Sequence, residues 1–487
     1  MQTGLRYRFL VFWISLAALL ISLPGCAWFG DESKRAKMMS VPEMSQSLAS
    51  ARPSLSANAP WPQPAWWEVF ETPALNRLIA AALADNPNFK AAAARLRQSQ
   101  AMVDAQAAEL YPTVDANVSF SAQRFSANST QAKLAGENFR QLLINPLVLR
   151  YHLDFWGRDQ AALEAAVGRS LAVATELADA KLLLASAVAG RYFDLVASSE
   201  KLTIAEKIVT DRKALLALQQ VRLATGLVTA APVLQAKMAL NAARQTEAGV
   251  RAEVDLQKNL LAALAGKGPD WGRSIVIASG VFPKHLALPA DLPLRLLAHR
   301  PDVTAARLHA QAAAQEIKVA ETAFYPDVNL IAFTGLHSVS LTDVLLQGSS
   351  LAYAVGPSIE FPIFEGGRLR ANLTYQQAGY DVAVERYNGS LVHAVQEVAD
   401  ALSRWRETDT RIAEQQQTVA DAAEAERLAD SLNRTGLNDR NELMLACVAA
   451  HQQRFRLATL KGEHFKTAVQ VIQALGGGFN EISAKPQ

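Results

Sequence analysis

Apolar and polar residues alternate with a period of two in two separate parts of the chain. In the first part, every second residue is apolar from Val114 to Ala122 and, after a loop rich in Asn, Ser, Gln and Gly, again from Leu147 to Phe155. The second part repeats this pattern from Val328 to about Leu336 and from Leu351 to Ile363. Strict alternation is typical of strands with one apolar and one polar face. We therefore predict two β-hairpins, at about residues 113–156 and 327–364.

Each predicted hairpin is followed by a very long segment that lacks proline. One segment runs from Asp159 to about Thr225 and the other from Arg368 to Thr435. As helices of 1.5 Å per residue, each would span on the order of 100 Å. Both end at a Thr-Gly-Leu sequence, in which Gly226 or Gly436 supplies the left-handed residue that ends a helix. Return helices are predicted after these turns, at residues 233–264 and 442–475.

The same landmarks occur twice in the same order. Tyr111 and Pro112, before the first hairpin, return before the second as Tyr325 and Pro326. Gly157 and the Thr225-Gly226 turn return as Gly367 and Thr435-Gly436, at nearly the same offset in residue number. Such recurrence indicates an internal repeat. The predicted domains are repeat 1 at 61–280, repeat 2 at 281–478 and a tail at 479–487.

The first 25 residues have the pattern of a signal peptide. Arg6 and Arg8 precede an apolar stretch from Phe9 to Leu23, with no acidic residue. The following Pro24-Gly25-Cys26 resembles the lipobox of bacterial lipoproteins, so we expect a diacylglycerol and an N-acyl chain on Cys26. Ordinary cleavage beside an incidental cysteine is the alternative. Residues 26–60 are expected to form an extended lipid-anchored tether. By resemblance to lipoprotein sorting signals, Ala27 rather than Asp after the cysteine favours the outer membrane.

Composition and motifs argue against several classes of protein. The net charge of +2 falls to 0 when Arg6 and Arg8 leave with the signal peptide, which gives no electrostatic case for nucleic acid. With Cys26 acylated, Cys447 has no disulfide partner. No mature segment reaches 18 uninterrupted apolar residues, so we expect no membrane-spanning helix. Neither a zinc-binding HExxH nor a phosphate-binding glycine loop nor a GxSxG sequence is present. We therefore expect no enzyme activity, catalytic residue, bound metal or other cofactor.

Four strands in one chain would leave two open edges. Neither water nor lipid tolerates such edges well, and strands of about ten residues match a tilted membrane-crossing strand. Hairpins lying on a soluble core are the alternative, but the sequence offers no further strands to pair with them. Two chains would close a barrel of 8 strands that side chains nearly fill, and three chains a barrel of 12 strands with a lumen. We expect the homotrimer.

With these features, the chain resembles the TolC/OprM family of outer-membrane efflux proteins, in its NodT-like lipoprotein branch. The resemblance extends from about Trp66 to Gly478. It rests on Trp66-Trp67, the two Tyr-Pro and two Gly-Arg sequences, the segment from Arg222 to Gly226, and the closing Ala474-Leu475-Gly476-Gly477-Gly478.

The resemblance implies a mostly α fold with a β-barrel part, in which a trimer forms a 12-stranded barrel and a helical periplasmic tube. It implies a passive exit duct for small toxic compounds or drugs, in the outer membrane, served by a periplasmic adaptor and an inner-membrane transporter of the RND type. An outer-membrane duct for type I protein secretion and a lipid-anchored coiled-coil scaffold are the alternatives.

The resemblance also suggests two functional regions near the helix turns. The expected adaptor contacts are Arg222, Thr225, Gly226, Arg434, Thr435 and Gly436, for which helix capping alone is the alternative. The expected periplasmic gate is a ring of carboxylates from Glu426 and Asp430, which are four residues apart and share a helix face. The first repeat has Leu216 and Gln220 at these positions. A solvated outer helix face is the alternative for the two acids.

Overall fold

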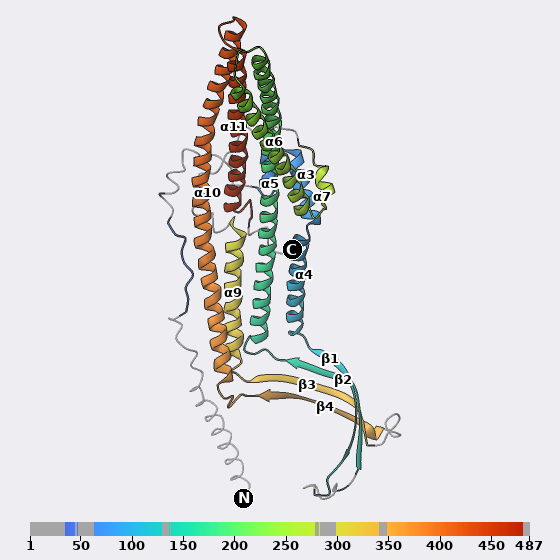
Figure 1. Ribbon diagram of the computed structural model, residues 1–487. Coiled ribbons are helices and arrows are strands. Elements are labelled where there is room, and N and C mark those ends of the chain that lie inside the picture. Colours follow the sequence, from blue (N-terminus) through green and yellow to red (C-terminus); the bar gives the residue numbers. More distant parts are fainter. Residues whose placement is uncertain are drawn as a thin grey trace, which may run out of the picture. The chain divides into compact units, whose positions relative to one another are not determined.

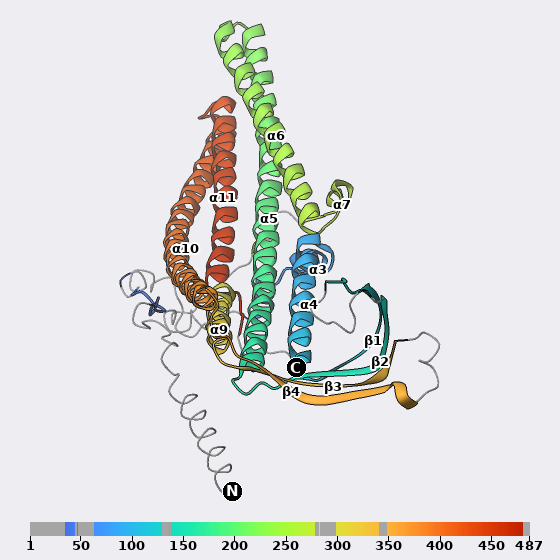
Figure 2. The same ribbon diagram turned by 90° about the horizontal axis from the view of Figure 1, so that it is seen from below.

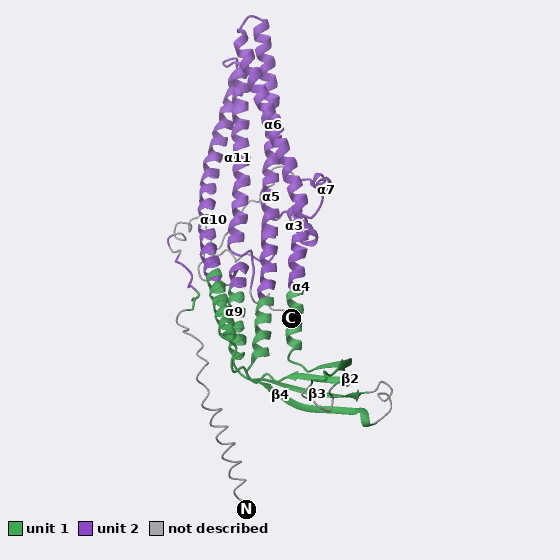
Figure 3. Ribbon diagram, turned by 60° about the horizontal axis from the view of Figure 1, so that its bottom comes forward, with its two compact units in different colours: residues 1–38, 98–170, 307–386 green, residues 39–97, 171–306, 387–487 purple. Residues whose placement is uncertain are grey.

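The structure is a computed structural model that describes residues 35–43, 46, 63–128, 136, 138–277, 282, 299–339 and 348–480. The signal peptide, Cys26, most of the predicted tether and the last residues of the predicted tail lie outside these ranges. In the described part, no helix combines the length and the apolar character that a membrane span requires. The chain divides into two compact units, and several of its longest helices contribute to both (Figure 3).

Unit 1 contains residues 1–38, 98–170 and 307–386, and its core element is one antiparallel sheet. The strands lie in chain order (Figures 1 and 2). Thr113 pairs with Arg150, His152 with Asn329, and Asp327 with Glu360. The strands are β1 (Thr113–Arg124), β2 (Asn138–His152), β3 (Asp327–Ser338) and β4 (Leu351–Glu360). Among the described residues, β1 and β4 are therefore open edges, and the two predicted hairpins join through β2 and β3.

Apart from shifts of one or two residues, three strand ends differ from the sequence pattern: β2 ends at His152 instead of Phe155, and the two other ends lie near a proline. β2 begins at Asn138 instead of Leu147, and its register with β3 shifts between Ile144 and Leu147. Pro146 lies inside this irregularity, where its missing N–H does not interrupt regular pairing. β4 ends at Glu360, so the predicted continuation of its alternation to Ile363 is wrong. Pro362 cannot donate to a ladder, and the chain turns there instead.

Six of the described helices form three pairs of equal length, with one member from each repeat. α4 (Pro87–Ala108) and α9 (Pro301–Thr322) each have 22 residues and precede the hairpins. α5 (Arg158–Ala224) and α10 (Arg368–Arg434) each have 67 residues, as the proline-free segments predicted. The return helices, α6 (Ala230–Leu264) and α11 (Arg440–Ala474), each have 35 residues.

The offset between the repeats changes inside the hairpins. α4 and α9 begin at positions 87 and 301, and β1 and β3 at 113 and 327, so one offset relates the segments before and into the hairpins. α5 and α10 begin at 158 and 368, and α6 and α11 at 230 and 440, so a slightly smaller offset relates the segments after them. The hairpin of repeat 2 (β3–β4) is therefore shorter than the hairpin of repeat 1 (β1–β2), and the offset is constant on either side of the hairpins. The equal helix lengths and the constant offsets support an internal repeat independently of the sequence motifs.

Unit 2 contains residues 39–97, 171–306 and 387–487, and its largest apolar core surrounds a group of aromatic rings. Phe193 of α5 contacts both Phe70 and Phe465, with ring centroids 4.9 and 5.1 Å away, and Phe70 and Phe465 also contact each other. Phe70 belongs to the short helix η3 (Trp66–Phe70), which leads into α3 (Pro73–Asp85). α5 and α11 approach closely here, because a Cβ added at Gly462 would lie 2.6 Å from the Cβ of Ala197. The short helix α7 (Pro269–Arg273) follows α6.

Candidate functional site

The turns that join α5 to α6 and α10 to α11 have the same backbone geometry. Gly226 and Gly436 both have φ of 73°, in the left-handed region. The N–H groups of Leu227 and Leu437 donate to the carbonyls of Arg222 and Leu432, at 2.8 and 2.9 Å. Together with donation from each glycine N–H to the carbonyl three residues before it, this is a Schellman motif. The predicted left-handed glycine turns are thus present in both repeats.

Each turn exposes a large apolar side chain and open space around its glycine. Leu227 is 72% exposed and Leu437 is 77% exposed. A Cβ added at Gly226 or Gly436 would meet no atom within 4 Å. Thr225 and Thr435 turn their hydroxyls inward, donating to carbonyls of the preceding helical turn. The surface available to a partner at each turn therefore includes the glycine backbone and the leucine side chain beside an exposed threonine whose hydroxyl is already bonded within the helix.

The two predicted arginines at the turns have different environments. Arg222 forms an ion pair with Asp439 at 2.8 Å, and Asp439 also accepts from the backbone N–H of Asn441 at the start of α11. Arg222 therefore connects the turn of repeat 1 to the turn of repeat 2. Arg434 pairs with Asp430 on its own helix at 2.7 Å and remains highly exposed.

Both predicted gate carboxylates are paired with arginines of the same chain. Glu426 accepts from Arg454 of α11 at 3.1 Å, and Asp430 pairs with Arg434. His451, one turn before Arg454 on α11, pairs with Asp211 of α5 at 2.8 Å. A ring built from Glu426 and Asp430 would therefore carry arginines beside its carboxylates. Arg454 and His451 were not expected from the sequence, because nothing local indicates which helix faces meet.

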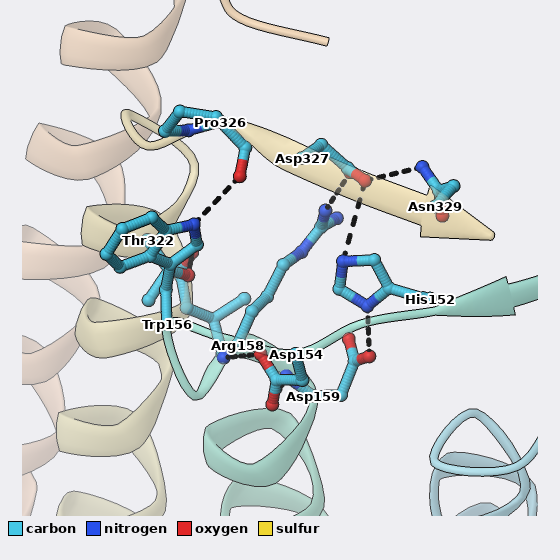
Figure 4. Close-up of polar contacts among 10 residues, drawn as sticks. His152, Asp154, Trp156, Arg158, Asp159, Thr322, Pro326, Asp327 and Asn329 are labelled. Carbon is cyan, nitrogen blue, oxygen red and sulfur yellow. Dashed lines mark hydrogen bonds and ion pairs between the residues drawn. The ribbon is translucent and has the colours of Figure 1, made fainter. Parts of the chain in front are cut away.

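The strand–helix junction in unit 1 contains a polar cluster (Figure 4). His152, at the end of β2, lies between Asp159 of α5 and Asp327 of β3, and Arg158 reaches the same Asp327 at 3.4 Å. Asp154 accepts from the backbone N–H groups of residues 158–160, which are the free donors at the start of α5. The cluster thus ties the exit from one hairpin to the entry of the other. A cavity of about 240 Å³ adjoins it.

Of the predicted strand-entry and strand-exit residues, Gly157, Tyr325 and Pro326 lie at this junction, whereas Tyr111 and Pro112 precede β1 at one edge of the sheet and Gly367 follows β4 at the other edge. Gly157 and Gly367 have φ of 74° and 87°, so each provides a left-handed turn into its helix. Tyr325 stacks on Trp156 with ring centroids 5.0 Å apart, and the carbonyl of Pro326 accepts from the Trp156 indole at 2.8 Å. Tyr111 and Pro112, their counterparts in repeat 1, are exposed. The tryptophan was not expected from the sequence.

A second charge cluster lies in unit 2. Arg300 is buried and donates to Asp302, to Glu397 and to the carbonyl of Ala474, at distances from 2.7 to 3.0 Å. It therefore joins the start of α9, the middle of α10 and the end of α11. Among the described residues, no group of three or more His, Cys, Asp or Glu side chains is placed to hold a metal ion.

The charged side chains of this cluster shift the pKa of the carboxyl group of Asp179 on α5. Its burial, followed by the charge of Asp302, raises the pKa of Asp179 to about 6, and Glu397 and Glu176 act in the same direction. The positive charge of Arg300 lowers the pKa of Asp179, but burial and the negative charges of the neighbouring carboxylates together outweigh it. The folded chain therefore holds the proton of Asp179 more tightly than an unfolded chain does.

We expect Asp179→Asn to stabilise the protein at neutral pH and to have little effect at pH 3.5. Because the folded-state pKa of about 6 exceeds the ordinary value of 3.8, the wild type loses stability as pH rises from about 4 to about 6. At roughly 1.4 kcal/mol per pKa unit, the variant should gain about 3 kcal/mol per chain at pH 8. Denaturant unfolding at the two pH values measures this gain, with Asp104→Asn on an exposed face of α4 as the control. An equal effect of Asp179→Asn at both pH values would contradict the assignment.

Comparison with known proteins agrees with this architecture. The model of the family described as "Outer membrane efflux protein" matches residues 78–267 and 292–477, so one segment falls in each repeat. The fusaric acid resistance protein FusA of Burkholderia cepacia is 32% identical over 477 residues, which cover 96% of this chain and 88% of FusA. The multidrug resistance outer membrane protein MdtQ of Escherichia coli O157:H7 is 27% identical over 475 residues, covering 96% of this chain and 98% of MdtQ.

Solved structures show the same fold. The outer membrane protein VceC of Vibrio cholerae is 32% identical, with a TM-score of 0.77 over 86% of this chain and 100% of VceC. The Campylobacter jejuni CmeC outer membrane channel has a TM-score of 0.82 at 20% identity, over 92% of this chain and 95% of CmeC. The TolC-like fold expected from the sequence is confirmed by these likenesses. This chain belongs to the outer membrane efflux protein family.

Proposed function

We propose that this chain is the outer-membrane channel of a tripartite efflux system and conducts small toxic compounds from an inner-membrane pump to the cell exterior. The observation that carries the proposal is a four-stranded sheet with two open edges, each hairpin of which continues into a 67-residue helix. A helix of this length spans on the order of 100 Å, which suits a duct across the periplasm.

The two faces of the sheet differ in the way that a barrel wall in a membrane requires. By the strand register, Asp115, Arg150, Asn329 and Glu360 belong to one face, together with His152. The opposite face carries exposed apolar side chains: Val114, Val118, Phe120, Tyr353, Val355 and Ile359. Lipid covers such an apolar face, and the polar face then lines the lumen.

Three copies close this sheet with a lumen. Each chain supplies four strands, so three chains give 12, whereas the 8 strands of two chains would enclose little more than side chains. Pairing β4 of one copy with β1 of the next removes every open edge. A coiled-coil scaffold would have no use for membrane-length strands with two different faces.

The helix turns are the proposed adaptor contacts. Gly226 and Gly436 allow close approach of a partner's backbone, and Leu227 and Leu437 offer apolar contact beside them. Arg434 is exposed at the same end, whereas Arg222 acts through its pairing with Asp439. The turn residues thereby contribute shape and apolar surface more than charge.

Deletion of the gene tests the function. We expect cells without the protein to accumulate dyes and drugs and to be inhibited at lower drug concentrations, with restoration by the wild-type gene. The names of FusA and MdtQ refer to resistance, which supports efflux over protein secretion. Unchanged drug accumulation together with loss of a protein from the culture medium would instead identify a secretion duct.

The lipid anchor is a separate part of the proposal and concerns Cys26. We expect the mature chain to begin at Cys26 with acyl chains attached, which intact-protein mass spectrometry measures. Cys26→Ser should remove the acyl mass and leave trimers able to form, because burial of acyl chains determines location and not barrel closure. An unmodified N-terminus at another residue would exclude the anchor.

A further inference from the structure

A cavity of about 360 Å³ lies in unit 2, between η3, the first turn of α4, the first half of α5 and the chain that follows α11. Its walls are mostly apolar and include Trp66, Trp67, Phe89 and Leu177. Of the described residues that line it, none is an aspartate or a glutamate. Its volume is within the range of small-molecule sites, which are mostly apolar with a few polar groups.

The indole N–H of Trp66 is a donor without a partner at this cavity. Trp66 is only 3% exposed, and no residue in the described part of the chain accepts a hydrogen bond from its Nε1. Gly477 also lines the cavity, and a Cβ added there would lie 3.2 Å from Nε1, so the glycine leaves room beside the N–H. Because a buried tryptophan N–H usually has a partner, this one suggests an acceptor that a ligand supplies.

Lys181 brings a positive charge to the same cavity. Its Nζ lies 5.9 Å from the centre of the Trp67 ring, and no carboxylate of the described residues forms an ion pair with it. The residues three and four positions away on α5 are leucine or alanine, so the helix itself offers no counter-charge. The ammonium group is therefore held beside the ring and is available to an anion.

The internal repeat provides a second version of this place in unit 2. By the offsets between the repeats, three of the lining residues have counterparts on α9 and α10. They are Phe89, Leu177 and Lys181, which correspond to Val303, Tyr387 and Leu391. The three counterparts are buried and belong to one apolar cluster. Lys181 thus stands where repeat 2 has a buried leucine.

In repeat 2 the chain itself covers this cluster. Val41 of the N-terminal segment packs against it, and the N–H of Met39 donates to the side chain of Asn388 at 2.8 Å. In repeat 1 the described residues leave the corresponding place as a cavity with a lysine in its wall. The comparison indicates a place that an apolar group covers in repeat 2 and that is available to an apolar group with a negative charge in repeat 1.

We propose that this cavity binds a small organic acid. The apolar body of the acid packs against Trp67 and Leu177, and its carboxylate accepts from the Trp66 N–H and pairs with Lys181. Both donors lie beside the Trp67 ring, since the Trp66 and Trp67 ring centroids are 5.8 Å apart. A neutral apolar molecule would leave both donors without a partner, and a cation would be repelled by Lys181. The site is independent of the proposed channel function.

Equilibrium dialysis of radiolabelled 1-naphthoate against the full-length trimer tests the site. The trimer is held in phosphatidylcholine nanodiscs, and empty nanodiscs give the background. We expect saturable binding of one molecule per chain. Binding of 1-naphthalenemethanol, which has the same rings without the charge, should be weaker by about tenfold or more. Equal affinities for the two compounds, or no saturable binding of naphthoate, would overturn the proposal.

Lys181→Met should weaken naphthoate binding by about tenfold and leave naphthalenemethanol binding unchanged, because methionine keeps an apolar stem and removes the charge. Lys213→Met is the matched control, since it makes the same replacement on α5 about 48 Å further along the helix. It should bind naphthoate as the wild type does. Wild-type binding by Lys181→Met would contradict the assignment of the charge.

Two further variants test the other parts of the cavity. Trp66→Phe keeps an aromatic ring and removes the N–H, so it should also weaken naphthoate more than naphthalenemethanol. Ala178→Phe places a ring inside the cavity and should abolish binding of both compounds. Full binding of naphthoate by Ala178→Phe would show that the acid binds elsewhere on the trimer, and would overturn the site.

Discussion

Gly226→Val and Gly436→Val are each expected to abolish efflux while trimers still insert into the outer membrane. The left-handed conformation costs a residue with a Cβ about 1–2 kcal/mol, and more for a β-branched one, so the turn must rearrange. No atom lies within 4 Å of the added Cβ, so we expect the change in backbone conformation to be confined to the turn. Dye accumulation should equal that of the deletion strain, and the trimer band should be unchanged.

Two substitutions separate turn geometry from side-chain bulk. Gly226→Asn tolerates the left-handed conformation and should keep most of the turn, so efflux should be reduced less than with valine. Gly249→Val places the same side chain in equally open space inside α6, where the backbone is helical, and should leave efflux intact. Normal efflux in both Gly226→Val and Gly436→Val would show that these turns do not contact the adaptor.

Asp430→Ala should raise single-channel conductance and reduce preference for cations. The change removes three carboxylates from a trimer and leaves three unpaired Arg434 side chains, since Asp430 and Arg434 pair at 2.7 Å in each chain. At a narrow entrance, such a change of local charge alters ion entry strongly. Planar-bilayer recordings with a salt gradient measure both quantities.

Glu424→Ala is the matched control for the gate. Glu424 is on the same helix and pairs with Arg427 at 2.6 Å, so its replacement changes the charge by the same amount. It should leave conductance and selectivity close to those of the wild type if the gate is at Asp430. If Asp430→Ala and Glu424→Ala behave identically, Asp430 lies on a solvated outer face of α10 and is not a gate residue.

Local signals in the sequence were sufficient for the hairpins and the long helices, but not for every strand boundary. Alternation located the hairpins, absence of proline gave the two 67-residue helices, and Gly226 and Gly436 marked their ends. These features depend on residues close in sequence. The irregularity at Pro146 was missed, because alternation restarts after it as if a new strand began.

Contacts between distant elements could not be predicted in the same way. Arg222 and Asp439 come from different repeats, and Arg454 and Glu426 lie on different helices. Which helix faces meet depends on the packing of the whole unit and not on local composition. His152 and Trp156 at the strand–helix junction were missed for this reason, although Tyr325 and Pro326 beside them were singled out.

The most direct test of the central claim is the electrical behaviour of the purified full-length trimer in planar bilayers. The account predicts discrete current steps of uniform size, one for each inserted trimer, because a 12-stranded barrel leaves a water-filled lumen. Detergent alone should give none. Membranes that contain the trimer and show no current steps at any voltage would contradict a channel formed by this chain.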